Sequence, residues 1–530
     1  MKKKLLLNFT ESLFRKRNFG ITAFAVLTLL IGQPAFAQKW NVIAGESEIA
    51  TVNTCYASIA VVGDVPYVAY VQATYGAGAT GPGKVKMKNP STGLWEQVGS
   101  DLSALAGFTR LYKDKNGVLH VTYIDRNTSY KLAVKKLVAG AWVPLSAGND
   151  FVSTAQGTGT FGASDMRGDL AFDKDNIPYV SYTERTAGNA SGYAYVRRFV
   201  NNVWENVGGG AVSSDLFTAG NGIAFDSNNV PYVVYIQQSV SNSGSGVIKT
   251  YRLANPTDIS WEDISPANPV APGTAISGAT NVARHTSIAI DDTDSPVITY
   301  FNTTSGASKA TSIRLADKIT KTWAWLGDIS TRDTNRNMLI GDGSGNLYTI
   351  FQDALIGNGT SATVRVFKKA SGASTFAELQ NLPITSESGV GIDAAGPNTT
   401  TAATKSVVTA TIALGSDITK PYIVYSKTNS SGFVTPIVRL FDPTIVLGVK
   451  NVALDANAIV AYTQNQNLKI QSGNIIMSEA KVYDVSGRLI AERKNIGSNE
   501  TSISLKSSNG VYLLKVTTVD GGVVTKKILQ

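Results

Sequence analysis

The sequence has little of the residues on which metal sites and disulfide-bonded folds depend. It holds one cysteine, Cys55, and two histidines, His120 and His285, among 530 residues. A single cysteine excludes an intrachain disulfide, so burial and sheet hydrogen bonds must hold the fold. No zinc-type cluster and no nucleophile elbow with a plausible histidine partner is visible, so we assign no catalytic residue, metal or cofactor.

Charged residues are also few, at 16% of the chain, and the net charge of +9 is unevenly spread. Residues 1–37 carry six basic and one acidic side chain, and residues 449–530 carry ten basic and six acidic. The region between them is therefore close to neutral. A neutral region lacks the positive field that phosphate backbones require, which excludes nucleic acid as a partner.

Long hydrophobic runs are missing too. The apolar run 21–31 has eleven residues, whereas a membrane-spanning helix needs about 20. A basic start precedes this run, and Ala35-Phe36-Ala37 follows with the small residues that signal peptidase requires. We predict that residues 1–37 are a signal peptide and that the chain has no transmembrane segment, with a membrane anchor as the alternative. The expected location is secreted or on the outer cell surface, via the periplasm.

A four-strand pattern recurs along residues 38–443. An apolar first strand ends in a tight turn, the second commonly reads Pro-Tyr-hydrophobic-x-Tyr, the third carries Arg or Lys, and the fourth reads Trp-x-x-hydrophobic. The second strand occurs seven times, at 66–70, 119–123, 178–182, 231–235, 296–300, 347–351 and 421–425. The fourth strand also starts seven times, at Trp40, Trp95, Trp142, Trp204, Trp261, Trp323 and Phe376.

Successive fourth strands start 47 to 62 residues apart. Four short strands in a repeat of about 50 residues are the signature of a β-propeller. Such a sheet packs both faces against its neighbours, so we interpret the repeated Tyr and Trp as packing residues. Two stacked β-sandwiches are the alternative, but they do not explain equal counts of two motifs. Trp40 precedes any complete repeat and the last repeat lacks a Trp strand, so we predict that 40–45 pairs as the outer strand of the last sheet.

The connections predict which face of the ring carries function. First-to-second and third-to-fourth connections are short and share one face, the short-turn face. The long segments 75–83, 148–160, 186–192, 239–246 and 265–282 gather on the opposite face, the loop-bearing face. Binding residues concentrate on long loops. The loop-bearing face is therefore the candidate binding surface.

Each first strand begins on the loop-bearing face, near the central channel. Six residues before the turn Asp stand Phe108, Arg167, Gly220, His285 and Arg336, and Arg284 adjoins His285. We predict that Arg167, Arg284, His285 and Arg336 form an anion-binding rim, with ordinary polar rim residues as the alternative.

Two other recurring sets are interpreted as structural. The turn acids Asp114, Asp173, Asp226, Asp291 and Asp342 loosely resemble calcium-loop spacing, but Asp in such turns usually bonds its own backbone. The third-strand cations are expected on a solvated or salt-bridged side. They are Lys86, Lys136, Arg198, Arg252, Arg314, Arg365 and Arg439.

Composition changes after Pro443, where short alternating strands predict a compact β-sandwich. Three motifs follow in order: 482–490 (VYDVSGRLI), 510–516 (GVYLLKV) and 526–529 (KKIL). Together they resemble the type A C-terminal sorting domain of the type IX secretion system of Bacteroidetes. The resemblance implies passage through the outer membrane by that machinery, and commonly removal of the domain. The usual Tyr-Pro-Asn-Pro segment is absent, and an adhesive immunoglobulin-like domain is the alternative.

The sequence thus predicts an all-β protein: a signal peptide (1–37), a seven-bladed β-propeller closed by its N-terminal strand (38–447), and a C-terminal sorting domain with an immunoglobulin-like β-sandwich fold (448–530). The expected function is binding of an extracellular glycan or protein. The alternatives are a hydrolase or lyase acting on extracellular polysaccharide, and a structural adhesion component.

Overall fold

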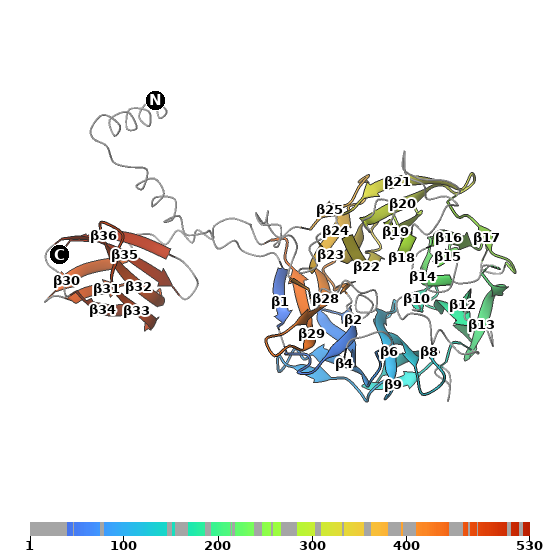
Figure 1. Ribbon diagram of the computed structural model, residues 1–530, viewed down its shortest axis with the longest axis horizontal. Helices are drawn as coiled ribbons and strands as arrows, with labels where there is room; N and C mark the ends of the chain where they lie inside the picture. The colour runs from blue at the N-terminus through green and yellow to red at the C-terminus, as the bar shows by residue number, and fades with distance from the viewer. Residues whose placement is uncertain are drawn as a thin grey trace, which may run out of the picture. The chain divides into compact units, whose positions relative to one another are not determined.

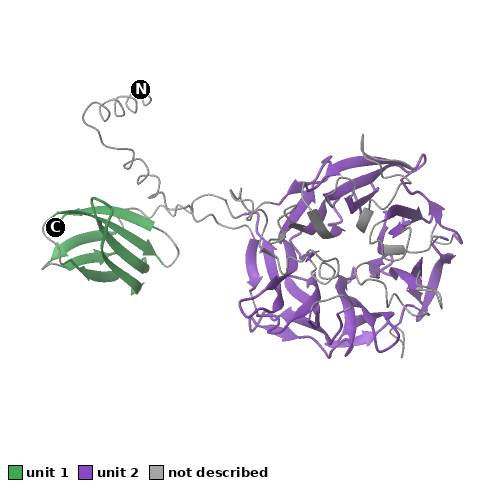
Figure 2. Ribbon diagram, viewed as in Figure 1, with its two compact units in different colours: residues 1–38, 445–530 green, residues 39–444 purple. Residues whose placement is uncertain are grey.

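The computed structural model describes residues 40–45, 47–74, 79–145, 151–153, 168–185, 192–212, 214, 218–237, 246–255, 258–266, 283–302, 309–330, 333–354, 362–379, 394–395, 410–444, 459–464, 467–473, 475–505, 510–518 and 523–529. The described elements are all β-strands. They belong to two compact units, one of residues 39–444 and one that includes residues 445–530 (Figure 2). Within these described residues there is no helix with the length and apolar character to span a bilayer.

The unit 39–444 is built from antiparallel sheets arranged in a circle, with the first strand of each sheet innermost (Figure 1). The sheets are β2 (Thr54–Val62), β3 (Val65–Gln72), β4 (Gly83–Lys88) and β5 (Trp95–Gln97); β6 (Ala106–Lys113), β7 (Leu119–Asp125), β8 (Lys131–Val138) and β9 (Ala141–Pro144); β10 (Asp169–Phe172), β11 (Pro178–Arg185), β12 (Gly192–Val200) and β13 (Val203–Ala211); β14 (Thr218–Phe225), β15 (Pro231–Gln237), β16 (Val247–Arg252) and β17 (Glu262–Asp263); β18 (Ala283–Ile290), β19 (Pro296–Asn302), β20 (Lys309–Asp317) and β21 (Thr322–Asp328); β22 (Asp333–Gly341), β23 (Leu347–Ala354), β24 (Ala362–Lys369) and β25 (Ala377–Glu378), with β26 (Ala394–Ala395) also on β24; and β27 (Ala410–Leu414), β28 (Pro421–Thr428), β29 (Val434–Phe441) and β1 (Trp40–Ala44).

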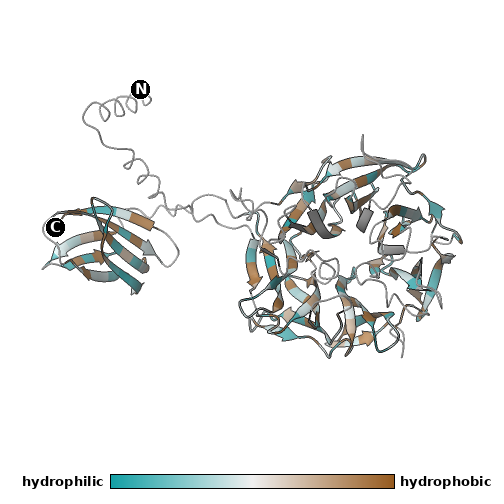
Figure 3. Cartoon of the chain, in the orientation of Figure 1, coloured by the Kyte–Doolittle hydropathy of each residue, from teal (hydrophilic) through white to brown (hydrophobic). Residues whose placement is uncertain are grey.

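The second strands are buried on both faces because each sheet lies between two neighbouring sheets. Their recurring aromatic residue is at most 2% exposed in each copy. Full burial of a large apolar side chain contributes roughly 1.5–3 kcal/mol. Bands of hydrophobic and hydrophilic residues alternate along the strands (Figure 3). The aromatic residues are Tyr70, Tyr123, Tyr182, Tyr235, Tyr300, Phe351 and Tyr425.

The circle is closed by strand β1, which comes first among the described strands of the chain. Strand β1 pairs antiparallel with β29, so residues near position 40 complete a sheet whose other strands lie about 400 residues later. Trp40 is 1% exposed, and Arg439 Nη1 donates to the Trp40 carbonyl at 3.0 Å. On the opposite side of the same sheet, the Ile59 N–H of β2 donates to Thr411 Oγ1 of β27 at 3.0 Å. The arrangement is β-propeller-like.

Inner strands are joined from sheet to sheet by one recurring hydrogen bond. The accepting side chain belongs to the inner strand and lies opposite the fourth residue of the second strand. It accepts a backbone N–H from the inner strand of the next sheet. This bond satisfies a donor on an edge that would otherwise be open. It joins Ser58 to Leu111, Asp169 to Ile223, Ser287 to Leu339 and Thr411 to Ile59, at 3.0, 3.1, 2.9 and 3.0 Å.

The short-turn face is joined by a second recurring bond. Each turn Asp accepts two N–H groups of its own turn; Asp173, for example, accepts from Asp175 and Ile177 at 3.0 and 2.8 Å. The fourth turn residue has a positive φ, 65° at Asn229, and its side chain accepts an N–H from the preceding sheet's turn. These bonds run from Lys115 to Asn176, Lys174 to Asn229 and Ser227 to Asp294, at 2.9, 2.8 and 2.7 Å. In the two-residue turn between β2 and β3, Asp64 likewise accepts the Ser416 N–H of the preceding sheet, at 3.1 Å.

The outer strands are joined by their tryptophans. The indole N–H of one sheet donates to a backbone carbonyl of the preceding sheet. The acceptor is the last residue of the Trp-x-x-hydrophobic motif, or of the motif that begins with Phe376. In these four copies the Trp-x-x-hydrophobic motif or its equivalent supplies both a packing residue and a hydrogen-bond acceptor for the next sheet. The indole nitrogens of Trp95 and Trp204 are buried without such a bond. The bonds run from Trp40 to Leu379, Trp142 to Val98, Trp261 to Val207 and Trp323 to Ile264, at 3.3, 2.9, 3.2 and 2.7 Å.

The C-terminal unit has two antiparallel sheets that share one hydrophobic core. Core residues come from both sheets, for example Leu468 and Ile503 from one and Val482 and Leu514 from the other. The first sheet has the order β30 (Val460–Gln464), β31 (Asn467–Gln471) and β34 (Glu500–Ser504). The second has the order β33 (Leu489–Ser498), β32 (Met477–Asp484), β35 (Val511–Thr518) and β36 (Val523–Leu529).

Candidate functional site

The predicted anion-binding rim falls at the edge of the described structure. Arg167 lies outside the described residues, and for Arg284, His285 and Arg336 only the backbone is described. Strand pairing shifts register between Arg284 and Ser287 in β18, and between Asn335 and Met338 in β22. His285 and Arg336 are therefore the first residues of a two-residue β-bulge in each inner strand. Their role in anion binding stays a prediction.

The same bulge recurs in the other inner strands. It comprises Tyr56-Ala57 in β2, Phe108-Thr109 in β6 and Gly220-Asn221 in β14. Tyr56 and Phe108 both have φ of 53°, which is unusual for bulky side chains and stores backbone strain. Their rings contact each other with centroids 4.3 Å apart. Counting six residues back from the turn Asp therefore finds the first residue of this bulge. Bulges redirect side chains and are common near functional sites.

A ring of polar side chains lies where the second strands end, on the loop-bearing face. The residue two places after the second-strand aromatic is polar in each copy, although the preceding positions are mostly apolar. Asp125 and Glu184 are buried, at 9% and 5% exposure. This ring was not among the predicted sites, and its sequence signal is the polar residue at a fixed position after the second-strand motif. The ring comprises Gln72, Asp125, Glu184, Gln237, Asn302 and Lys427; at the equivalent sequence position Asp353 only the backbone is described.

Glu184 is held by a buried tyrosine. Tyr182 Oη donates to Glu184 Oε2 at 2.7 Å. Burial, and then the negative charge of Glu184, raise the pKa of Tyr182 well above its usual value, so the phenol stays a donor. Asp125 Oδ1 accepts the Asn127 N–H at 2.8 Å and so organises the turn that follows β7. These carboxylates are therefore fixed in orientation.

A buried ion pair lies nearer the channel, between the β6–β9 and β10–β13 sheets. Arg110 Nη1 contacts Asp169 Oδ1 at 2.9 Å, and Tyr112 Oη donates to the same oxygen at 3.1 Å. Asp169 Oδ2 accepts the Ile223 N–H at 3.1 Å. Burial acts to lower the pKa of Arg110, but the charge of Asp169 together with Tyr112 offsets it and the pKa is raised. Asp169 is thus fully engaged by three donors, which suits a residue that positions the inner strands.

Other sequence candidates have structural partners. Each turn Asp bonds backbone N–H groups, as predicted. His120 is buried, contacts Phe172 with ring centroids 4.9 Å apart, and has a pKa lowered by that burial. Within the described ranges, no cluster of His, Cys, Asp and Glu is suited to hold a metal ion.

The third-strand cations are largely ion-paired, as expected for a structural role. Arg314 pairs with the turn acid Asp291 of its own sheet. The other pairs join third and fourth strands. The contacts are Arg198–Glu205, Arg252–Glu262, Arg314–Asp291 and Arg365–Glu378, at 3.4, 2.6, 2.6 and 2.6 Å.

Comparison with known proteins gives one family match. A model described as "Domain of unknown function (DUF8694)" matches residues 447–530. No curated protein matches the chain.

Solved structures with some similarity include a protein of unknown function from Dyadobacter fermentans, 13% identical, which spans 63% of this chain and 94% of its own at a TM-score of 0.41. Another is a fungal alcohol oxidase in complex with copper, 10% identical, which spans 94% and 99% at 0.45. A third is the GH93 α-L-arabinofuranosidase of Fusarium graminearum, 14% identical, which spans 65% and 94% at 0.38. These identities and TM-scores are too low to transfer an activity.

Proposed function

We propose that residues 38–447 form a seven-bladed β-propeller that binds an extracellular glycan through its loop-bearing face. The observation that carries the proposal is the contrast between the two faces. On the short-turn face, the turns are occupied by hydrogen bonds between neighbouring sheets, such as the bond from the Lys174 N–H to the Asn229 side chain. The opposite face carries the polar ring with Asp125 and Glu184, in the position where ring-shaped folds collect binding groups.

Oriented carboxylates, amides and hydroxyls are the groups that recognise sugar hydroxyls, because each presents a fixed hydrogen-bond acceptor or donor. Arg167, Arg284, His285 and Arg336 are proposed to add positive charge to the same rim, which would favour acidic sugars. If the glycan screen finds no ligand, the proposal changes to a protein ligand on the same face.

The test is a glycan-array screen of the mature chain, residues 38–530, followed by calorimetry with the best ligand. Glu184→Gln and Asp125→Asn keep the shape of each side chain but remove its charge, and we expect about tenfold weaker binding. Asp294→Asn on the short-turn face is the matched control and should bind like the parent. Equal weakening in the control would remove the assignment to the loop-bearing face.

A glycoside hydrolase is the second candidate. It is favoured by Asp125 and Glu184, two buried carboxylates at the ends of the second strands β7 and β11. Paired carboxylates are what glycoside cleavage requires. Incubating the hit glycan and arabinan with the mature chain, and measuring reducing ends, separates the two candidates. Turnover that Glu184→Gln abolishes would establish the enzyme.

We further propose that residues 448–530 form a β-sandwich that routes the chain through the type IX secretion machinery after a signal peptide delivers it to the periplasm. The ordered motifs at 482–490, 510–516 and 526–529 support this proposal. A fluorescent reporter that carries residues 1–37 and 448–530 should leave a bacterium that possesses this machinery. Retention of that reporter in the periplasm would refute the proposed route.

A further inference from the structure

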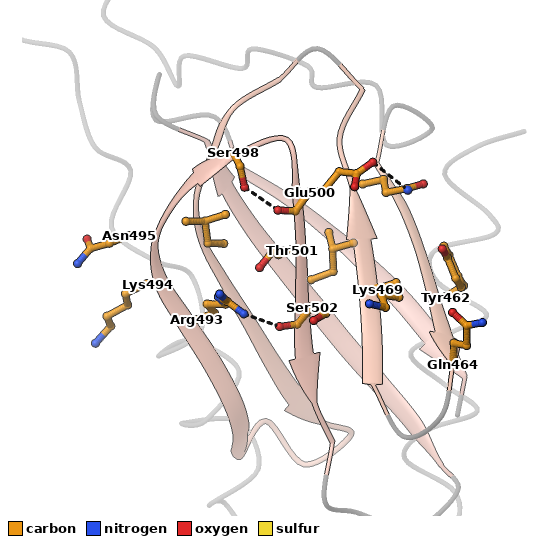
Figure 4. A pocket seen from close by; sticks show the side chains of 13 residues that line it. Tyr462, Gln464, Lys469, Arg493, Lys494, Asn495, Ser498, Glu500, Thr501 and Ser502 are labelled. Carbon is orange, nitrogen blue, oxygen red and sulfur yellow. Dashed lines mark hydrogen bonds between the residues drawn. The ribbon is translucent and has the colours of Figure 1, made fainter.

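The C-terminal unit carries a polar groove that the propeller proposal does not involve. The groove has a volume of about 610 Å³ and is lined by residues of β30, β31, β33 and β34 (Figure 4). Apart from Ile470, Ile496 and the ring of Tyr462, the lining side chains are polar or charged. Such a lining suits a hydrophilic ligand rather than a lipid or an apolar helix.

Four groups lie in a row across this groove. Tyr462 on β30 pairs in register with Lys469 on β31, which pairs in turn with Ser502 on β34. Arg493 of β33 continues the row, because its Nη1 donates to the Ser502 carbonyl at 3.0 Å. With about 4.8 Å between neighbouring strands, the row from β30 to β34 spans about 10 Å. An aromatic ring, a cation, a hydroxyl and a second cation therefore follow one another (Figure 4).

The two cations of this row lack a carboxylate partner among the described residues. Acids elsewhere in the unit pair with other cations: Glu479 with Lys481, Asp484 with Arg488 and Glu492 with Lys494, at 2.7, 3.0 and 3.3 Å. The one carboxylate of the lining, Glu500, accepts a hydrogen bond from Gln471 Nε2 at 3.1 Å. The lining thus carries three cations, Lys469, Arg493 and Lys494, against the one carboxylate of Glu500, so the groove is net positive.

The outer edge of β34 is blocked against an added peptide strand. Ser498 Oγ donates to the Glu500 carbonyl at 2.6 Å, and Arg493 occupies the Ser502 carbonyl. Strand addition needs these carbonyls free. Tyr462 is 45% exposed at the rim, and an exposed aromatic ring beside polar groups offers a flat apolar surface to one face of a sugar.

We propose that this groove binds an acidic saccharide. One sugar ring packs on Tyr462, its carboxylate or sulfate group contacts Lys469 and Arg493, and its hydroxyls contact Ser502 and Gln464. Charge-assisted hydrogen bonds to the two cations supply most of the selectivity for acidic over neutral sugars. The site lies entirely in the C-terminal unit and does not depend on what the propeller binds.

Calorimetry on the mature chain, residues 38–530, tests this site with trigalacturonic acid, neutral galactotriose and sodium sulfate as probes. We expect trigalacturonic acid to bind at least about tenfold more tightly than either other probe. Lys469→Gln and Tyr462→Ala should each weaken the binding of trigalacturonic acid about tenfold or more. Lys469→Arg keeps the positive charge and should retain most of the parent's affinity. Melting curves establish that each variant is folded.

Lys515→Gln and Lys527→Gln are the matched controls, since each removes one exposed positive charge from the other sheet of the same unit. Both should bind like the parent. Equal weakening in the controls, equal affinity for the neutral trisaccharide, or no binding by the parent chain overturns the inference. Binding that survives Lys469→Gln but is lost in Arg336→Ala belongs to the propeller, and this result would remove the groove site while leaving the proposed function in place.

Discussion

Replacement of Trp40 measures how much the N-terminal strand contributes to the closed circle. The side chain is 1% exposed and packs in a cluster with Ile437 and Phe441. Its indole N–H donates to the Leu379 carbonyl at 3.3 Å. Truncating a buried Trp to Ala costs about 3–5 kcal/mol in the free energy of unfolding. Trp40→Ala therefore removes the packing and the sheet-to-sheet bond together.

The expected change in melting temperature follows from the size of the unit. A cooperative unit of about 400 residues has an unfolding entropy of roughly 0.85 kcal/mol per kelvin. A loss of about 4 kcal/mol then lowers the melting temperature by about 5 °C. Trp40→Phe keeps an aromatic ring, as the chain itself does at Phe376, but loses the hydrogen bond. This variant should lower the melting temperature by only about 1–2 °C.

Far-UV circular dichroism during heating is the assay, because it does not depend on the tryptophan that is removed. Val42 on the same strand is 52% exposed, so Val42→Ala is the control and should melt within about 1 °C of the parent. The reasoning is refuted if Trp40→Ala melts like Val42→Ala. Deletion of residues 38–48, which leaves β29 as an unpaired edge, should be more destabilising than either substitution.

Two further changes test the short-turn face and the buried histidine. Asn229→Gly keeps the positive φ but loses the acceptor for the Lys174 N–H, whereas Asn229→Ala also adds backbone strain. Ala should therefore lower the free energy of unfolding in urea by about 1 kcal/mol more than Gly. Equal effects of the two substitutions would contradict the strain assigned to the positive φ of Asn229. Burial lowers the pKa of His120 below its usual value of 6.5, so its neutral form stabilises the fold above that pH and the contribution is lost as pH falls. His120→Tyr introduces the residue that another second strand has at the equivalent position, Tyr179. This variant should reduce the fall in melting temperature between about pH 7.5 and 5.0. An unchanged fall would show that other groups cause it.

The repeat was readable from the sequence because each strand has one fixed environment. A second strand lies between two sheets in every copy, so the same aromatic is required at the same place, as at Tyr182 and Tyr235. The unpaired Trp40 motif likewise pointed to the N-terminal segment as the outer strand of the last sheet, where β1 pairs with β29. The all-β character follows from the same pattern.

Other elements left no such pattern. Strand β33 was not predicted, because Leu489–Ser498 is largely exposed and has no regular alternation of apolar and polar residues. Its neighbours in the sheet, rather than its own sequence, fix it as a strand. The Arg110–Asp169 pair could not be foreseen either, because it joins two sheets at positions that hold Ser58, Ser287 or Thr411 elsewhere.

The binding site on the loop-bearing face stays a prediction, because the long segments that define this face lie largely outside the described residues. Counting from the turn Asp located the inner-strand bulges at Phe108 and His285. The polar ring escaped notice because its members differ in charge and size, from Glu184 to Lys427. What groups them is their fixed position two residues after the second-strand aromatic, which places them at the strand ends.

Hydrogen–deuterium exchange on residues 38–530, with and without the best ligand of the glycan screen, tests the central claim most directly. The account predicts slower exchange at the ends of β7 and β11 and at the beginnings of β6 and β18, which lie on the loop-bearing face. Exchange in the turns around Asp173 and Asp226 should not change. Protection confined to those turns, with none at the strand ends, would contradict the claim that the loop-bearing face is the binding surface.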